Sequence, residues 1–340
     1  MVGEPKNHSY PMSSQKLYLI IYFLAFYTGI IWLFYHLNRN RQRILVFHHI
    51  IPDNLITDSF EQQFVCSSQY HFERVIDIVN KRLDVTTQLG KPNSAIITID
   101  DGYRAALTAD AVLRKYNNNA YFFLPLFNVD AGPLWNDRIK GWMAYVAPGE
   151  YTIAGQTYYL YSQSSRRKVY NAIIESIYTN DCNYSPIIEE LETICPFDKL
   201  NISEEYANLR FRGLTLDEIS QLKRNGHKIG AHSINHEVLS LLPSEKLKQD
   251  FQYCSAQINK LFNCSLYAYP FGHKRHVSIE CVKECAASGF SAAVMNEYVP
   301  DETPYTLSRM NIIRYTSRYE IDAELSGFKQ WVRNILRWKK

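Results

Sequence analysis

The sequence lacks the features of a disulfide-rich, nucleic-acid-binding or repetitive protein. Its seven cysteines form no CxxC pair and have no regular spacing, and their odd number leaves at least one thiol unpaired. A disulfide scaffold and a cysteine–zinc site are therefore not indicated. The formal net charge of +3 is too small to suggest a nucleic-acid partner, and no basic stripe is interleaved with aromatics. Internal repeats and low-complexity tracts are also absent. A length of 340 residues suits one large hydrophobic core or two modest ones.

One long apolar run lies near the amino terminus. Residues 17–37 carry no formal charge at neutral pH and follow a polar tail, residues 1–16. As a helix this run would be about 32 Å long, enough to cross the hydrocarbon core of a bilayer. We therefore predict an uncleaved, single-pass membrane anchor over 17–37, with a buried helix as the alternative. A cleaved signal peptide is disfavoured because no small-x-small site follows.

The charges on either side of this run do not set its orientation. The amino terminus, Lys6 and Lys16 precede it, and Arg39, Arg41 and Arg43 follow it. Three positive charges on each side leave the positive-inside rule undecided.

After the anchor, short apolar runs alternate with amphipathic stretches. This alternation predicts an α/β protein with a parallel sheet or a β/α barrel. The predicted strands are 43–47, 95–99, 120–124, 228–231, 266–269 and 292–295, and the predicted helices include 104–116, 215–225, 244–262 and 278–287.

Two regions depart from this alternation, and they divide the chain into parts. Residues 128–212 contain two polar helical stretches, and we interpret them as an insertion or cap within a catalytic domain of residues 43–325. Residues 326–340 are basic and amphipathic, which suits either a helix on a membrane surface or a solvated final helix.

Two motifs carry the chemistry, and each directly follows a predicted strand. Asp100 and Asp101 follow the strand at 95–99, and His232 and His236 begin and end an HxxxH string after 228–231. One carboxylate and two imidazoles form a tripod for a divalent transition metal and leave a position open for water. Asp100 points the other way along an extended backbone. A carboxylate that does not bind the metal suits a general base, so the chain is interpreted as a metal-dependent hydrolase.

A third string, Ala268 to Gly272, lies near these motifs. Pro270 removes one backbone donor, so the N–H of Phe271 is the next one free to point into a pocket. A backbone N–H beside a metal can serve as an oxyanion hole.

Taken together, these strings resemble the motifs of the NodB-type polysaccharide deacetylases, carbohydrate esterase family four. The first motif of that family, T-[FI]-D-D-G, matches residues 98–102, the second, H-[ST]-x-x-H, matches 232–236, and the third, R-x-P-[YF]-G, matches 269–272 in part. The resemblance implies a distorted (β/α)7 barrel. It also implies that Asp100 is the base, that Asp101, His232 and His236 hold the metal, and that the Phe271 N–H helps to bind the oxyanion.

The chain departs from the family pattern at two points. Ala268 stands where many members carry the arginine that orients the base, and Arg309 is our candidate replacement. The late histidine that usually acts as general acid is absent. Instead, His48 matches the [YF]-H start of circularly permuted members such as the poly-β-1,6-N-acetylglucosamine deacetylases. We therefore assign His48 as the acid, and the alternatives are that His273 is the acid or that His48 is a structural histidine. We expect His49 to face away by strand alternation.

Further residues are candidates for the sugar groove. Trp135 and Asp137 resemble a string of the same branch, and Trp135 either lines the groove or is structural. Tyr269 and Pro270, beside the predicted oxyanion donor, are also assigned to substrate binding.

The resemblance implies a hydrolase of carbon–nitrogen bonds in linear amides, which removes N-acetyl groups from N-acetylglucosamine units of a poly- or oligosaccharide. Zinc is the expected metal, and cobalt or nickel suits the same ligands. Members that modify exopolysaccharide act outside the cytoplasm, so we expect an extracytoplasmic catalytic domain at the cell membrane. The alternatives are a lipid-linked formamido sugar or a small cyclic amide as substrate, or a catalytically silent, membrane-tethered carbohydrate-binding protein.

Overall fold

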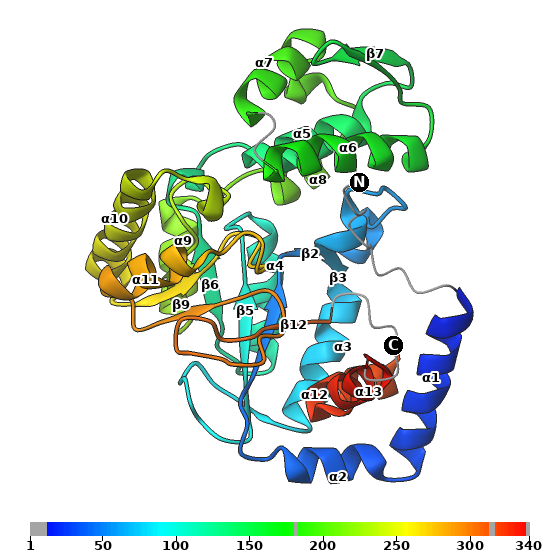
Figure 1. Ribbon diagram of the computed structural model, residues 1–340, viewed down its shortest axis with the longest axis vertical. Helices are drawn as coiled ribbons and strands as arrows, with labels where there is room; N and C mark the ends of the chain where they lie inside the picture. Colours follow the sequence, from blue (N-terminus) through cyan, green and yellow to red (C-terminus); the bar gives the residue numbers. More distant parts are fainter. Residues whose placement is uncertain (1–11, 180–182, 313–316, 338–340) are drawn as a thin grey trace.

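The computed structural model describes residues 12–179, 183–312 and 317–337, and it shows a curled parallel sheet surrounded by helices (Figure 1). Seven strands follow one another across the sheet, and all neighbouring pairs are parallel. The predicted α/β class is confirmed, in the form of a half-barrel. The strands in spatial order are β11 (Ala292–Val294), β10 (Leu266–Ala268), β9 (Lys228–Ala231), β6 (Tyr121–Leu124), β5 (Ser94–Ile99), β1 (Arg43–Phe47) and β12 (Met310–Asn311), with β4 (Asp84–Val85) beside β5.

The central strands are buried along their whole length. Every residue of β1, β5 and β6 is buried, as expected where helices cover the outer face of a parallel sheet and side chains fill its inside. Four of the six helices that follow the strands begin at a serine or threonine whose side chain accepts from a backbone N–H of the first turn. At α9, for example, Thr215 and Glu218 form both bonds of the capping box that their spacing suggests. The six helices are α3 (Gln69–Asn80), α4 (Ala105–Lys115), α9 (Leu216–Arg224), α10 (Ser244–Phe262), α11 (Ile279–Ala287) and α12 (Arg318–Ser326).

One short segment reaches both ends of the sheet. Leu307 forms a parallel bridge with Val294 at the end of β11, and β12 pairs with Leu45 and Val46 of β1. Arg309 lies between these two attachments and is almost completely buried. Arg309 therefore lies between the two edges of the curled sheet, close to both β11 and β1.

The inserted region forms a cap at one end of the molecule, the top of Figure 1. It has a hydrophobic cluster separate from that of the sheet, which includes Trp142, Ile139 and Leu191. Its elements are α5 (Trp135–Tyr145), the antiparallel pair β7 (Glu150–Ile153) and β8 (Gln156–Tyr159), α6 (Gln163–Tyr178), α7 (Tyr184–Ile194) and α8 (Glu204–Arg210).

The predicted single transmembrane helix over 17–37 is wrong, because two helices occupy this region. α1 (Met12–Tyr27) and α2 (Ile30–Leu37) are bent by 79° at a break where Gly29 takes a left-handed φ of 84°. Glycine adopts this conformation without the steric cost of a Cβ, so the helix can break there. In the described residues no single helix is long and apolar enough to cross a bilayer, and only the bent pair passes by length and composition.

The two amino-terminal helices pack against the carboxyl end of the chain. Tyr22, Ala25 and Ile31 share a buried cluster with Phe328 and Val332 of α13 (Phe328–Arg337). Figure 1 shows α1 and α2 beside α12 and α13. A glycine at 327, with φ 85°, separates α12 from α13, and the end of the predicted carboxyl-terminal helix, 338–340, lies outside the described residues.

Short elements connect the sheet to the cap. β2 (His49–Ile51) pairs with β3 (Cys66–Ser68) in a separate two-stranded sheet, so the chain leaves the main sheet at His48.

The six cysteines in the described part of the chain are free. Single 3₁₀ turns occur at Asp53–Leu55, Gln62–Phe64, Leu126–Asn128, Phe197–Lys199 and Leu239–Leu241.

Candidate metal centre

Asp101, His232 and His236 come together at the carboxyl end of the sheet. Asp101 lies two residues beyond β5, and His232 directly follows β9. Oδ1 of Asp101 is 3.4 Å from Nε2 of His232 and 3.4 Å from Nε2 of His236. All three side chains are buried. Parallel strands deliver their carboxyl ends to one edge, which explains why residues so far apart in sequence meet here.

The spacing of these atoms fits a single metal ion. Two ligand atoms that each lie about 2.1 Å from a tetrahedral ion are about 3.4 Å apart. Nδ1 of His232 is 2.7 Å from the carbonyl of Ala268, so an N–H at Nδ1 donates to that carbonyl and leaves the Nε2 lone pair facing the site. The three residues can therefore hold a divalent ion.

The charge of Asp101 suits a ligand. Burial alone would raise the pKa of its carboxyl, but contacts with His232, His236 and His49 outweigh burial and hold the pKa well below its ordinary value. Asp101 is therefore ionised at neutral pH, as a metal ligand must be.

Asp100 points to the other side and is held by Arg309. Nη1 and Nη2 of Arg309 donate to the two carboxylate oxygens of Asp100, each at 2.7 Å. The guanidinium also donates to Thr98 Oγ1 and to the carbonyl of Met295. Burial would raise the pKa of Asp100, but the charge of Arg309 dominates and lowers it. A carboxylate with bidentate support keeps further lone pairs for a proton.

Several residues at the site have a left-handed backbone. Asp101 (φ 74°), Ser233 (62°), His236 (57°) and Phe271 (59°) all lie in this region. Such conformations cost about 1–3 kcal/mol each for bulky side chains and persist where the surroundings fix them. Gly102 shares the sharp turn after β5, where a Cβ would lie 3.0 Å from the side chain of Leu124. This concentration of strain supports a functional role for the edge.

Phe271 borders the metal ligands through its ring and its backbone. Its ring is 4.7 Å from that of His236, and its N–H has no hydrogen bond to any part of the chain that the structure describes. The proposed oxyanion donor is therefore unpaired beside the ligands. Pro270 is buried, and Tyr269 is fully buried with its phenol donating to the carbonyl of Tyr305. The Tyr269 side chain thus faces the core, so its assignment to substrate binding is corrected.

The two adjacent histidines after β1 both face the site. His48 is half-buried, and its Nδ1 has no hydrogen-bond partner in the described residues. Burial lowers the pKa of His48, and the charges of Asp101 and Asp100 offset only part of that effect. The expectation that His49 faces away is wrong, because its Nε2 lies 3.3 Å from Oδ2 of Asp101. Strand alternation does not apply here, since β1 ends at Phe47 and His49 begins a different sheet.

A buried ionic network lies behind His49. Arg210 of α8 donates to Asp137 at 2.6 Å and to Glu61 at 2.7 Å, and all three side chains are buried. The hydroxyl of Tyr103 donates to the second oxygen of Asp137 at 2.9 Å. The network joins the cap to the metal centre, and sequence reasoning missed it. The only available signal for His49 was a second histidine at the end of an apolar run.

The remaining sequence candidates lie around the site. Trp135 is 6% exposed, and its indole N–H donates to the carbonyl of His236 at 2.9 Å, so it supports the ligand loop while little of its ring reaches solvent. His273 is half-exposed and lies 3.5 Å from Glu297. A further histidine, His276, is buried against Tyr178 and Phe271 with no hydrogen bond to its ring nitrogens in the described residues.

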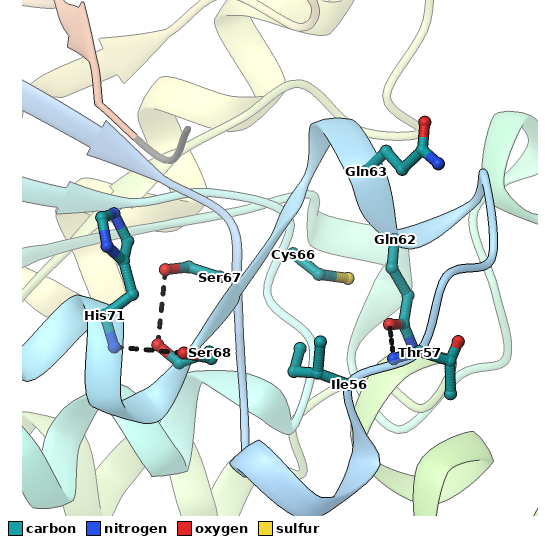
Figure 2. A pocket seen from close by; sticks show the side chains of 8 residues that line it. All are labelled: Ile56, Thr57, Gln62, Gln63, Cys66, Ser67, Ser68 and His71. Carbon is teal, nitrogen blue, oxygen red and sulfur yellow. Dashed lines mark hydrogen bonds between the residues drawn. The ribbon is translucent and has the colours of Figure 1, made fainter. Parts of the chain in front are cut away.

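A separate cavity of about 170 Å³ lies between the loop before β3 and the start of α3 (Figure 2). None of the metal-centre residues contributes to its walls. The chemistry therefore belongs to the sheet edge and not to this cavity. The lining residues are Ile56, Thr57, Gln62, Gln63, Cys66, Ser67, Ser68 and His71.

Comparison with known proteins agrees with this arrangement. Residues 193–289, which include both histidine ligands and Phe271, match the family model for polysaccharide deacetylase. No curated protein matches the sequence significantly.

Solved structures share the fold at low sequence identity. A polysaccharide deacetylase from Bacillus cereus aligns over 84% of this chain and 68% of its own, with a TM-score of 0.51 and 15% identity. The Streptococcus pyogenes deacetylase PplD, in complex with acetate, aligns over 83% and 96%, with a TM-score of 0.50 and 13% identity. IcaB from Ammonifex degensii aligns over 84% and 97%, with a TM-score of 0.50 and 14% identity.

Proposed function

We propose, from the premise that this chain is a NodB-type polysaccharide deacetylase, that it removes N-acetyl groups from N-acetylglucosamine units of a poly- or oligosaccharide and releases acetate. The single observation that carries this proposal is the division of labour between adjacent carboxylates. Asp101 faces two histidines at metal-ligand spacing, while Asp100 faces Arg309 and stays free of that set. A structural metal site has no use for the second arrangement.

The ligand set suits zinc, and cobalt or nickel fits the same nitrogen and oxygen donors. When bound, the ion supplies Lewis-acid polarisation of the acetyl carbonyl and lowers the pKa of water. The side chains of Asp101, His232 and His236 would hold it.

The chain's own groups then divide the proton transfers. A carboxylate oxygen of Asp100 accepts the proton of the attacking water, and Arg309 keeps this carboxylate oriented and ionised. The N–H of Phe271 donates to the developing oxyanion. His48 donates a proton to the nitrogen of the leaving amine, which cannot depart as an anion. In the circularly permuted branch that the sequence resembles, the acid also comes from the amino-terminal end.

The test is acetate release from defined chitooligosaccharides by the full-length chain loaded with Zn²⁺, Co²⁺ or Ni²⁺. We expect activity with at least one metal, loss of it with a strong chelator, and loss of it in Asp100→Asn. If the metal-loaded chain cleaves only a formamido sugar or a cyclic amide, metal-dependent amide hydrolysis is supported and the proposed saccharide substrate is rejected. Metal binding without hydrolysis of any amide would instead favour a silent carbohydrate-binding protein.

We also propose that α1 and α2 attach the protein to the cell membrane, with the catalytic domain outside the cytoplasm. Their inner face packs on α13, while large apolar side chains on their outer face are exposed. Soluble proteins rarely expose so many neighbouring apolar side chains. Examples are Leu17, Ile20, Phe23, Leu24, Leu33 and Leu37.

Membrane fractionation followed by an alkaline wash tests this attachment. Retention of the full chain in the membrane pellet is expected, and replacement of Leu24 and Leu33 by serine should release it. Recovery of the unaltered chain in the wash would contradict the proposal. Protease protection in intact cells then decides the side of the membrane.

A further inference from the structure

His49 lies directly behind the carboxylate ligand of the metal centre. Its Nε2 is 3.3 Å from Oδ2 of Asp101, whereas Oδ1 of the same carboxylate faces His232 and His236. We propose that His49 is a positioning residue that fixes the carboxylate of Asp101, so that Oδ1 alone is presented to the metal. This inference rests on the metal site of the proposed function and assigns a role to a residue outside the ligand set.

The surroundings hold His49 in place from several sides. Its backbone N–H donates to the carbonyl of Val65 at 3.1 Å, where β2 pairs with β3. Its ring lies 5.1 Å from that of Tyr103 and is 1% exposed. The ring therefore has little freedom to turn away from Asp101. The close contact between the two residues joins a ring nitrogen of His49 to a carboxylate oxygen of Asp101 at 3.3 Å.

A second ion between His49, Asp101 and Asp137 is the obvious alternative, because one donor atom from each lies within 4.8 Å of the others. Both oxygens of Asp137 are already engaged. Oδ1 accepts from Arg210 at 2.6 Å, and Oδ2 accepts from Tyr103 at 2.9 Å. A cation placed here would also lie close to the buried guanidinium of Arg210. The cluster therefore suits a support for Asp101 and not a second metal.

The support acts by reducing the ways in which Asp101 can rotate. A carboxylate free on one side can turn its plane or offer both oxygens, and either motion disturbs a three-residue ligand set. Removal of a group that orients a metal ligand typically weakens metal affinity about 10–100-fold. The effect should appear in metal binding before it appears in the chemistry.

The decisive comparison uses two side chains of similar length at position 49 in the full-length protein. Glutamine keeps an N–H donor near the place of Nε2, whereas methionine has none. We expect His49→Met to raise the Kd for Zn²⁺ by about 10–100-fold, measured by competition with a chromophoric chelator. His49→Gln should stay within a few-fold of the original chain. The visible absorption spectrum of bound Co²⁺ should change in the methionine variant and be largely restored by glutamine.

A matched control separates positioning from general damage. His276 is also buried, and its ring nitrogens have no hydrogen bond in the described residues, so His276→Phe should leave the Kd for Zn²⁺ unchanged. Equal Zn²⁺ affinity in the Met, Gln and original chains would overturn the role of His49 while the proposed function stands. If the original chain binds no metal at all, the proposed function fails as well. Should His49→Met not fold, the pair His49→Leu and His49→Asn makes the same comparison at shorter length.

Discussion

Arg309 holds both carboxylate oxygens of Asp100 at 2.7 Å, although 209 residues separate them in sequence. The guanidinium reaches this carboxylate from the segment that touches both edges of the curled sheet. We propose that it fills the role expected of the arginine that is missing at Ala268. The backbone carbonyl of Ala268 is 2.7 Å from Nδ1 of His232.

Loss of Arg309 should change the pH dependence of the reaction. Because its charge lowers the pKa of Asp100 against the effect of burial, Arg309→Lys or Arg309→Ala should raise that pKa. The acidic limb of kcat/KM should then move to higher pH, most in the alanine variant. Breaking a buried pair also costs about 3–5 kcal/mol of stability, so Tm should be recorded alongside.

Arg43 provides the control for Arg309, because it is equally buried and donates to the carbonyl of Leu325 away from the site. Arg43→Lys should lower Tm without moving the acidic limb. An unshifted limb in the Arg309 variants would remove Arg309 from the mechanism.

The histidine ligands should control metal content. We expect about one divalent ion per purified chain, measured by elemental analysis, and most of it lost in His232→Ala or His236→Ala, because two remaining ligands hold an ion poorly. His273→Ala is the control, since that residue lies at the surface beside Glu297. Full metal content in both ligand variants would show that the site is elsewhere.

Substitutions of the adjacent carboxylates, Asp100 and Asp101, should have different effects. Asp100→Asn should keep the metal and lose about a hundredfold or more in turnover, because the base is gone. Asp101→Asn should lose metal affinity first. Elemental analysis and acetate release, measured on the same samples, distinguish the two variants. Near-normal turnover in Asp100→Asn would place the base at another residue.

His48 should matter for amides more than for esters. His48→Ala should lose most amidase activity yet keep metal content and much of its hydrolysis of a nitrophenyl acetate, whose leaving group needs no proton. Activity should decline with rising pH as the acid loses its proton, and because burial lowers the pKa of His48 this decline should lie at lower pH than for an ordinary histidine. The variant should lack this decline. If His273→Ala shows this pattern instead, the acid lies on the other side of the site.

Asp250 should make stability depend on pH. Its carboxylate accepts from the N–H of Ile234 inside the ligand loop, and burial raises its pKa from 3.8 to about 6. The folded state therefore prefers the protonated form, and the stability from this preference is lost as pH rises from about 4 to about 6. As pH rises across that window, the free energy of unfolding of Asp250→Asn should increase by up to about 3 kcal/mol relative to the original chain. Urea unfolding at several pH values gives the free energy of unfolding of both proteins. The same dependence of this free energy on pH in both would contradict the prediction.

The sequence by itself determined the sheet and the identity of the main site residues. Buried apolar runs such as 43–47 and 228–231 form strands at nearly the predicted bounds, because only a covered parallel sheet accommodates segments without a polar face. Asp100 and His232 directly follow such runs, and Asp101 and His236 lie a few residues beyond the strand ends. Parallel strands bring their carboxyl ends together, so these residues had to meet once the sheet formed.

Only the tertiary structure decided what lies around that core. The helices on either side of Gly29 pack against α12 and α13, and the local apolar pattern of residues 17–37 does not encode these contacts. Arg309 and Asp100 meet because the sheet curls, and His49 faces Asp101 because the chain changes sheets at His48. Local periodicity fixes the direction of a side chain only while the element continues. Beyond its end, contacts between distant segments determine where the side chain points.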